Sequence, residues 1–75
     1  MQTTKTEIDF INKLGKRIVS LRKDRDLKQI DLAIKINIED SALRRIESGR
    51  TNPTLKTLLR IAEGLEVSIN ELFML

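Results

Sequence analysis

The segment from residue 29 to residue 49 restricts the fold of this chain more than any other part of the sequence. Its apolar residues recur at three- and four-residue steps on both sides of Asn37, which predicts two short helices packed across a tight turn. Asn37 itself readily takes the left-handed backbone needed just past a helix end. The apolar positions are Leu32, Ala33, Ile36, Ile38, Ala42, Leu43 and Ile46. Burying them leaves a polar, cationic face on the second helix of the pair.

Composition favours a single small helical domain. The chain has 75 residues, of which 40% are hydrophobic and only 3% aromatic, with plentiful Leu, Ile, Lys, Arg and Glu. A chain of this length makes one domain, and aliphatic and long charged side chains suit packed helices. We therefore expect an all-α fold without an extended sheet or a deep catalytic cleft.

Several classes of protein are disfavoured by the residue types that the chain lacks. Without cysteine or histidine there is no disulfide, no thiolate or imidazole ligand for zinc and no neutral-pH base. There is also no run of the roughly 18–20 apolar residues that a membrane span needs, and no apolar signal core at the amino terminus. We expect a cytoplasmic protein with no metal, no cofactor, no enzymatic activity and no membrane partner.

Apolar periodicity and capping residues predict three helices in the first two thirds of the chain. The first covers residues 7–24 with Thr6 as its cap, and Gly15 within it favours close approach of a neighbouring backbone. The third begins near Glu39 or Asp40 and ends before Gly49. The second covers residues 28–36, with Ile30, Ala33 and either Ile34 or Leu32 facing inward.

Two further helices complete the prediction. Thr54 caps the fourth, which ends just before Gly64, and Ser68 with Glu71 forms a capping box for a short helix over residues 69–75. We expect residues 1–6 to be a flexible tail, residues 7–75 one domain, and the helix pair to occupy about residues 28–48. The expected inward residues of the fourth helix are Leu55, Leu58, Leu59 and Ala62.

Positive charge is concentrated around the helix pair. Between Lys13 and Arg50 there are eleven Lys or Arg and six Asp or Glu residues, whereas each flanking segment has a net charge of −1. A basic surface is typical of nucleic-acid-binding domains, although many basic helices are merely solvated. Charge alone therefore does not identify the partner.

The polar side of the third helix has the side chains needed to recognise DNA bases. Arg can bond guanine through two acceptors, Ser adapts to several bases, and Asp accepts from the cytosine amino group. A helix that enters the major groove presents such residues in its first turns. The residues at the required steps are Asp40, Ser41, Arg44, Arg45 and Ser48. We expect the first four, the recognition face, to contact bases of double-stranded DNA.

The chain resembles the Cro/Xre family of phage-repressor-like helix-turn-helix transcription regulators over residues 14–73. The resemblance implies a compact five-helix, lambda-repressor-like domain that binds DNA, with the helix-turn-helix at the second and third helices. It rests on Gly15-Lys16-Arg17-Ile18, Leu21-Arg22, Leu27, Gln29, Leu32-Ala33, Ile46-Glu47, Gly49, Asn52-Pro53, Leu55, Leu58, Ile61-Ala62, Leu65, Val67 and Glu71-Leu72-Phe73.

The resemblance also implies roles for residues around the recognition face. Gln29 would bond a phosphate and buttress the third helix; the alternative is a plain polar residue at a helix start. Arg22 and Glu47 match a structural ion pair between the first and third helices. The predicted phosphate-contacting set is Lys28, Gln29, Glu39, Arg50, Thr51 and Asn52. For the last three, an ordinary polar turn is the alternative.

Three positions depart from the family pattern. Lys28 replaces the usual Ser or Thr cap, Asn37 the usual turn glycine, and Glu39 the usual Ser or Thr that enters the third helix. Glu39 would be repelled by phosphate, so it either turns away to cap the helix or selects against wrong sites by repulsion. Asp40 raises the same question.

One short recognition helix covers only a few base pairs, so we expect a homodimer on a near-palindromic operator. The expected dimer contact lies at the carboxyl end, where apolar residues exceed what one short helix can bury; closure of the chain's own core is the alternative. This group is Ile69, Leu72, Phe73, Met74 and Leu75.

The sequence thus predicts a transcriptional regulator, a repressor of the phage type or a restriction-modification controller. An antitoxin of a toxin-antitoxin pair is one alternative, although little chain remains for a toxin-binding extension. A protein-interaction module on the same fold, with an unknown protein partner, is the other. Steep loss of DNA affinity with salt would distinguish the first class from the last.

Overall fold

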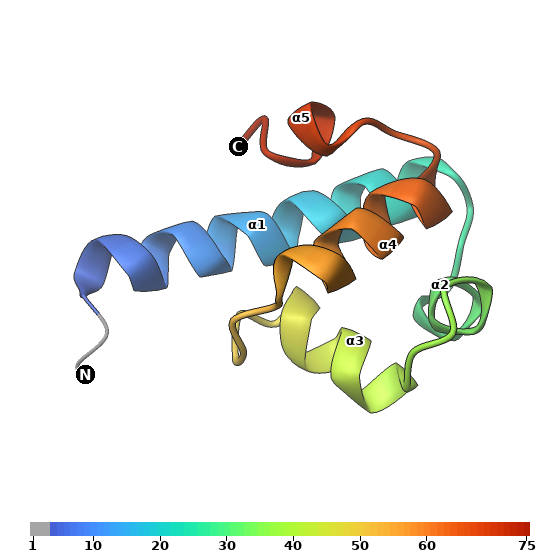
Figure 1. The fold of residues 1–75 in the computed structure, drawn as a ribbon, viewed down its shortest axis with the longest axis horizontal. Coiled ribbons are helices and arrows are strands. Elements are labelled where there is room, and N and C mark those ends of the chain that lie inside the picture. The colour runs from blue at the N-terminus through green and yellow to red at the C-terminus, as the bar shows by residue number, and fades with distance from the viewer. Residues whose placement is uncertain (1–3) are drawn as a thin grey trace.

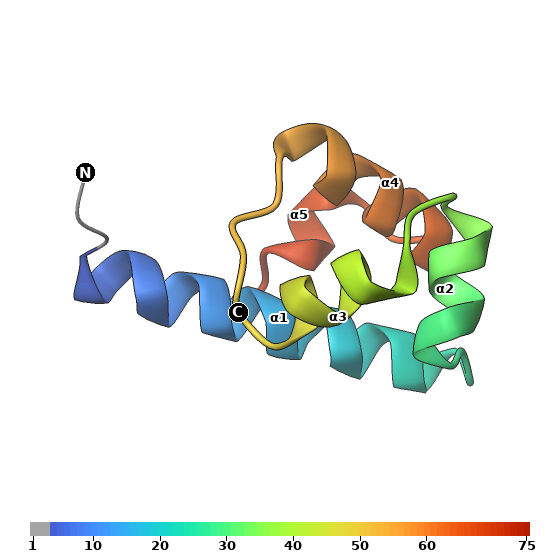
Figure 2. The same ribbon diagram turned by 90° about the horizontal axis from the view of Figure 1, so that it is seen from below.

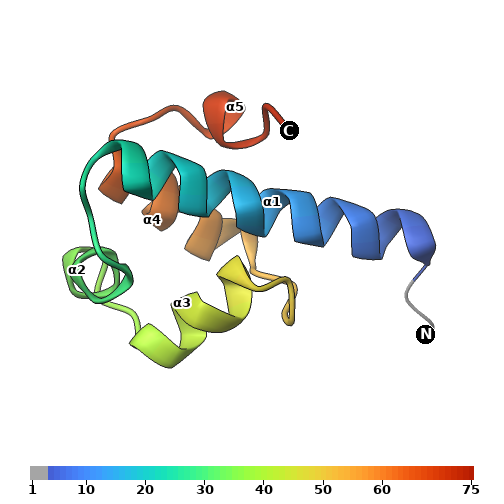
Figure 3. The same cartoon turned by 180° about the vertical axis from the view of Figure 1, so that it is seen from behind.

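Five helices and no strand make up residues 4–75, the part of the chain that the computed structural model describes. They are α1 (Lys5–Asp24), α2 (Gln29–Lys35), α3 (Asp40–Glu47), α4 (Leu55–Leu65) and α5 (Ile69–Leu72). α1 and α4 lie side by side, α5 covers one side of this pair, α3 packs on the other side and α2 lies across one end (Figures 1 and 3). The expected all-α, five-helix architecture is confirmed.

All five helices contribute to one aliphatic core. Its most completely buried side chains are Ile18, Leu32, Leu43, Ile61, Leu65 and Leu72. Each helix contributes at least one of these residues, so detaching any helix would expose apolar core surface to water. Within residues 4–75, no helix is both long and apolar enough to cross a membrane.

The first helix begins earlier than its sequence suggested. Thr4, not Thr6, is the cap: its hydroxyl oxygen accepts from the Glu7 amide at 3.1 Å, and the Glu7 carboxylate accepts from the Thr4 amide at 2.6 Å. This reciprocal capping box provides hydrogen bonds to two backbone amides at once, which favours a helix start at Thr4 over the start expected at Thr6. Residues 5 and 6 of the predicted tail are therefore helical, and its residues 1–3 lie outside the described part. The first turns of α1 project beyond the other helices (Figure 2).

The inward faces of α2 and α4 agree only in part with the expected ones. Leu32 and Ala33 on α2 and Leu58 and Ala62 on α4 are buried as expected, together with Ile61, Gly64 and Leu65. However, Ile30 and Ile34 on α2 are 46% and 72% exposed, and Leu55 and Leu59 on α4 are 64% and 49% exposed. Helical periodicity in a segment of two or three turns permits more than one apolar face, and contacts with the other helices decide between them.

Gly64 lies inside α4 and not just past its end. A Cβ atom at this position would lie 2.4 Å from Ile36 Cγ2 and 3.0 Å from Leu32 Cδ1. The missing side chain therefore lets α4 approach the last turn of α2. The helix ends at the next residue, Leu65, and is followed by Glu66, which has a left-handed backbone with φ of 59°.

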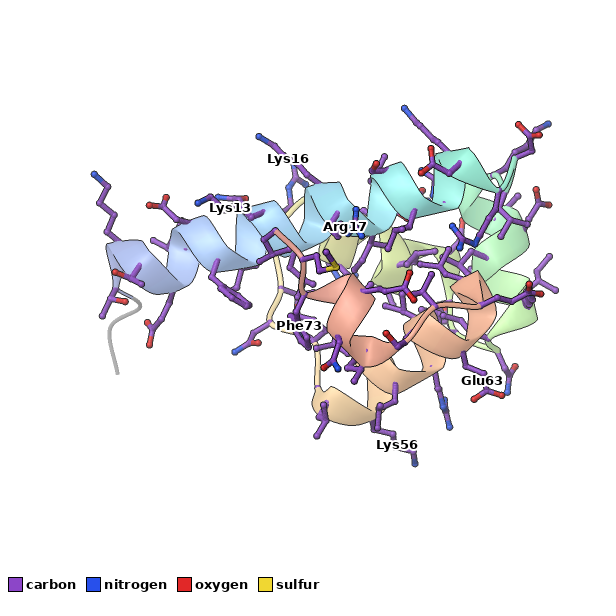
Figure 4. All side chains as sticks on the ribbon, turned by 90° about the horizontal axis from the view of Figure 1, so that it is seen from above. Lys13, Lys16, Arg17, Lys56, Glu63 and Phe73 are labelled. Carbon is purple, nitrogen blue, oxygen red and sulfur yellow. The ribbon has the colours of Figure 1, made fainter. Side chains whose placement is uncertain are left out.

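The carboxyl-terminal helix is shorter than expected. α5 has four residues, ending at Leu72 rather than at residue 75, and its Ser68–Glu71 capping box is present as predicted. Arg17 points from α1 toward α5 (Figure 4), and its Nε donates to the Glu71 carbonyl oxygen at 3.0 Å. This hydrogen bond and the buried Leu72 fasten α5 to the core.

Candidate nucleic-acid interface

α3 crosses α1 at a point of backbone contact. A Cβ atom on Gly15 would lie 2.5 Å from the Glu47 carbonyl oxygen and 2.7 Å from that of Ile46. Real Cβ atoms do not come this close to backbone oxygen, so the crossing requires glycine on α1. The predicted close approach at Gly15 is confirmed, and its partner is the last turn of α3.

A buried polar network fixes the same end of α3. Glu47 is only 8% exposed, and its carboxylate accepts two hydrogen bonds from Arg22, from Nε at 2.9 Å and from Nη2 at 3.0 Å. The remaining Arg22 amino group donates to the Leu27 carbonyl oxygen at 2.8 Å. This bidentate geometry gives orientation as well as energy. The sequence-predicted ion pair between α1 and α3 is present.

Gln29 joins this network from α2. Its Nε2 donates to Glu47 Oε1 at 2.9 Å, so the first residue of α2 is bonded directly to the last residue of α3. The buttressing role considered for Gln29 is confirmed by this bond. One carboxylate thus connects three helices, and the mutual orientation of α2 and α3 is set by hydrogen bonds as well as by apolar packing.

The recognition face lies on the side of α3 away from the core. Arg44 and Arg45 are exposed, Asp40 and Ser41 are partly buried in the first turn, and Leu43 and Ile46 face inward. Asp40 Oδ2 and Arg44 Nη2 are 3.2 Å apart, an ion pair across one helical turn. Ser48, which the sequence placed on the same side, lies just past the end of α3; it is exposed, and its hydroxyl donates to the Arg45 carbonyl oxygen at 3.2 Å.

The loop after α3 lies next to the recognition face. A surface hollow of about 230 Å³ is bordered by Arg45 from α3 and by Thr51 and Asn52 from the loop. Arg50, at the start of the loop, is exposed. Three of the residues expected to contact bases or phosphates therefore share one concave part of the surface.

The two departures at helix starts are resolved differently. Lys28 precedes α2 and makes no side-chain cap; instead, its backbone amide donates to Asp31 Oδ2 at 2.9 Å. Glu39 precedes α3 and makes no side-chain capping hydrogen bond, so, of the two alternatives for this residue, the one in which it caps the helix is wrong. Its exposed carboxylate remains at the edge of the recognition face.

The carboxyl-terminal apolar group is divided by the fold. Leu72 is fully buried and Ile69 packs against the core, so Leu72 is not available to a second copy as expected. Phe73, Met74 and Leu75 are 36%, 67% and 47% exposed. The Phe73 ring lies 6.0 Å from that of Phe10 in the projecting part of α1, a neighbour that the sequence did not suggest.

The recognition face and the adjoining loop carry mainly polar and charged side chains. Residues 4–75 include no group of three or more acidic, histidine or cysteine side chains placed to hold an ion. What the surface offers is exposed guanidinium, hydroxyl and amide groups on a rigidly oriented helix and its adjoining loop.

Comparison with known proteins gives these features a family. A helix-turn-helix family model, HTH_3, matches residues 18–72. The immunity repressor protein of Bacillus phage phi105 is 42% identical over 57 residues, which are 76% of this chain and 40% of that protein. The chain therefore spans less than half the length of that repressor.

Solved structures agree with the sequence match. The restriction-modification controller C.AhdI from Aeromonas hydrophila has a TM-score of 0.82 and 32% identity over 84% of this chain and 96% of its own. The controller C.Esp1396I, solved as a tetramer with its natural 35 base-pair operator, has a TM-score of 0.80 and 34% identity over 85% and 84%. The chain belongs to the helix-turn-helix family described by the HTH_3 model.

Proposed function

We propose that this chain is a sequence-specific DNA-binding transcriptional regulator that represses by occupying an operator as a homodimer. The observation that supports it most is the α2–α3 pair, whose exposed Arg44 and Arg45 are held in place by the buried Arg22–Glu47–Gln29 network. An oriented cationic helix suits the major groove. The similar proteins are an immunity repressor and two restriction-modification controllers, one of them solved on its operator.

The proposed division of roles follows the position of each side chain. Ser41, Arg44 and Arg45, with Asp40 beside them, contact base edges, because they occupy the exposed side of α3. Lys28, Arg50, Thr51 and Asn52 contact phosphates on either side, because they lie at the start of α2 and in the loop after α3. Gln29 is able to do both tasks, since one amide hydrogen is bonded to Glu47 and a second remains.

A second copy is proposed because α3 has only eight residues and spans few base pairs. Two copies on adjacent half-sites would supply the affinity that one lacks. The proposed contact is formed by Phe73, Met74 and Leu75, with Phe10 next to them, since these apolar side chains have substantial exposed surface.

Gel mobility shift with duplexes selected from random DNA tests the proposal. We expect binding whose affinity falls steeply with salt, because phosphate contacts release counterions. Replacing Arg45 with Gln should reduce preference among sequences, whereas replacing Arg50 with Gln should weaken all sequences alike. Lys13→Gln is the charge-matched control, because Lys13 projects from the edge of α1 away from α4 (Figure 4).

Two results would contradict the proposal. Selection that enriches no sequence at low salt would favour a protein-interaction module on the same fold. Equal loss of preference in the Arg45 and Arg50 variants would contradict the separate roles of α3 and the loop.

A further inference from the structure

The two arginines of the recognition face have different electrostatic surroundings. Arg44 is paired with Asp40, with Nη2 and Oδ2 3.2 Å apart and the two side chains 62% and 48% exposed. Arg45 follows directly in the chain, is exposed, and forms no ion pair within residues 4–75. The helix therefore presents one paired and one unpaired guanidinium at neighbouring positions within residues 4–75.

An unpaired arginine near DNA has two competing partners. Its guanidinium can bond a phosphate, which is the same in every sequence, or the O6 and N7 acceptors of guanine, which are not. A carboxylate next to the guanidinium changes this choice, because it repels phosphate but not a neutral base. The Asp40 contact engages only Nη2, which leaves Nε and Nη1 for a base.

We propose that Asp40 is a positioning residue that directs Arg44 to a guanine and keeps it from the phosphate backbone. This inference rests on the proposed DNA-binding function and names a determinant of its specificity. It also gives the acidic residue at the start of α3 a role: Asp40 lowers non-specific affinity, and it does so without abolishing the base contact of its partner.

Asp40→Asn tests this role because it removes the charge and keeps the shape of the side chain. The probes are a duplex selected by the wild-type protein and a scrambled duplex of equal length and composition. We expect the variant to bind the scrambled duplex more tightly and to lose about tenfold in the ratio of the two affinities, as for one lost base discrimination.

Glu63→Gln is the matched control. It removes the same charge from an exposed residue of α4, outside the recognition face and the loop after α3, where the carboxylate forms no ion pair within the described chain. A change in net charge alone alters affinity for both duplexes equally, so we expect the ratio to stay unchanged. The difference between the two variants isolates the effect of the Asp40–Arg44 pair.

Salt dependence provides a readout that a merely structural role would not change. Freed from Asp40, Arg44 should neutralise one more phosphate of the scrambled duplex and steepen the slope of log affinity against log salt by about 0.9. Adding Arg44→Gln to Asp40→Asn should remove this increase. Thermal melting checks that each exposed substitution leaves the fold intact.

The outcomes separate this inference from the function on which it rests. If Asp40→Asn changes the affinity ratio no more than Glu63→Gln does, or leaves the salt slope unchanged, the inference is overturned while sequence-specific binding by the wild-type protein still supports the proposed function. If the wild-type protein does not distinguish the two duplexes, the proposed function fails and the inference fails with it.

Discussion

Gly15 shows how a single residue can determine the position of the recognition helix. The last turn of α3 contacts α1 at this residue, with carbonyl oxygens where a Cβ atom would otherwise be. Those oxygens belong to the backbone and cannot rotate away as a flexible side chain could. The position of α3 therefore depends on the absence of a methyl group on α1.

Gly15→Ala should lower the free energy of unfolding by about 1–3 kcal/mol, because overpacking against backbone outweighs the gain in helix propensity. DNA affinity should fall as well, since α3 must shift. Urea denaturation and mobility shift measure the two effects. Ser20→Ala, at an exposed position of α1, is the control and should be neutral or slightly stabilising. If Gly15→Ala is as stable as the wild type, α1 and α3 can move apart without cost and the close contact at Gly15 does not fix α3.

Glu47 is the other residue on which the geometry of α3 depends. Glu47→Ala leaves the Arg22 guanidinium, whose side chain is 11% exposed, without its carboxylate and should cost about 3 kcal/mol. DNA binding should weaken in parallel. A double variant, Arg22→Met with Glu47→Leu, should recover stability because it leaves no unpaired buried charge. It should not recover DNA binding, because the hydrogen bonds that orient α3 are still missing. Thermal melts that match the wild type for Glu47→Ala would contradict this.

The ends of the helices share one solution to chain reversal. After α1, α2, α3 and α4 the chain has a residue with positive φ, respectively Asp26, Asn37, Gly49 and Glu66. In each case the next amide donates back to a carbonyl five residues earlier, as in Leu27 to Arg22 and Val67 to Ala62. Three of the following residues, Leu27, Ile38 and Val67, pack against the core. Turn and core thus stabilise each other.

Glu66→Gly should stabilise the protein by about 0.5–1 kcal/mol, because glycine takes the left-handed backbone without steric cost. The Lys35–Glu66 ion pair, at 3.6 Å with Glu66 78% exposed, contributes little and its loss should not offset the gain. Glu66→Ala is the control, since it removes the carboxylate but keeps the Cβ atom, and should not stabilise. Chemical denaturation of the wild type and the two variants measures the difference in free energy of unfolding. If Glu66→Ala stabilises the protein as much as Glu66→Gly does, the gain comes from removing the charge and not from the backbone.

Exposed apolar residues of the whole molecule fall on more than one surface, and only one is proposed to meet a second copy. Phe10, Phe73, Met74 and Leu75 combine the projecting start of α1 with the carboxyl end. Ile34, on α2, is as exposed as any of them. Exposure by itself does not distinguish these surfaces. The contact between the Phe10 and Phe73 rings, which brings the start of α1 next to the carboxyl end, favours the surface that contains Met74 and Leu75.

Met74→Glu should raise the dimer dissociation constant at least tenfold, since a charge would be buried in the interface. Ile34→Glu adds the same charge at an exposed residue of α2 and should leave association unchanged. Sedimentation equilibrium over a concentration series measures both. A Met74→Glu protein that associates like the wild type would contradict the proposed contact.

The amino-acid sequence is enough to specify the number and order of the helices, the turn at Asn37 and the stop at Gly49. These features depend on local backbone preferences and on spacings that short-range physics enforces. The Arg22–Glu47 pair joins residues 25 apart in the chain and was expected only from the resemblance to a known family. Tertiary packing decided the rest. Neighbours distant in sequence decide which apolar face of α2 and of α4 is buried and place Gly64 inside a helix. They also decide that Leu72 is part of the core whereas Met74 is exposed. A helix of two or three turns has several acceptable inward faces, and only the helices packed against it select one.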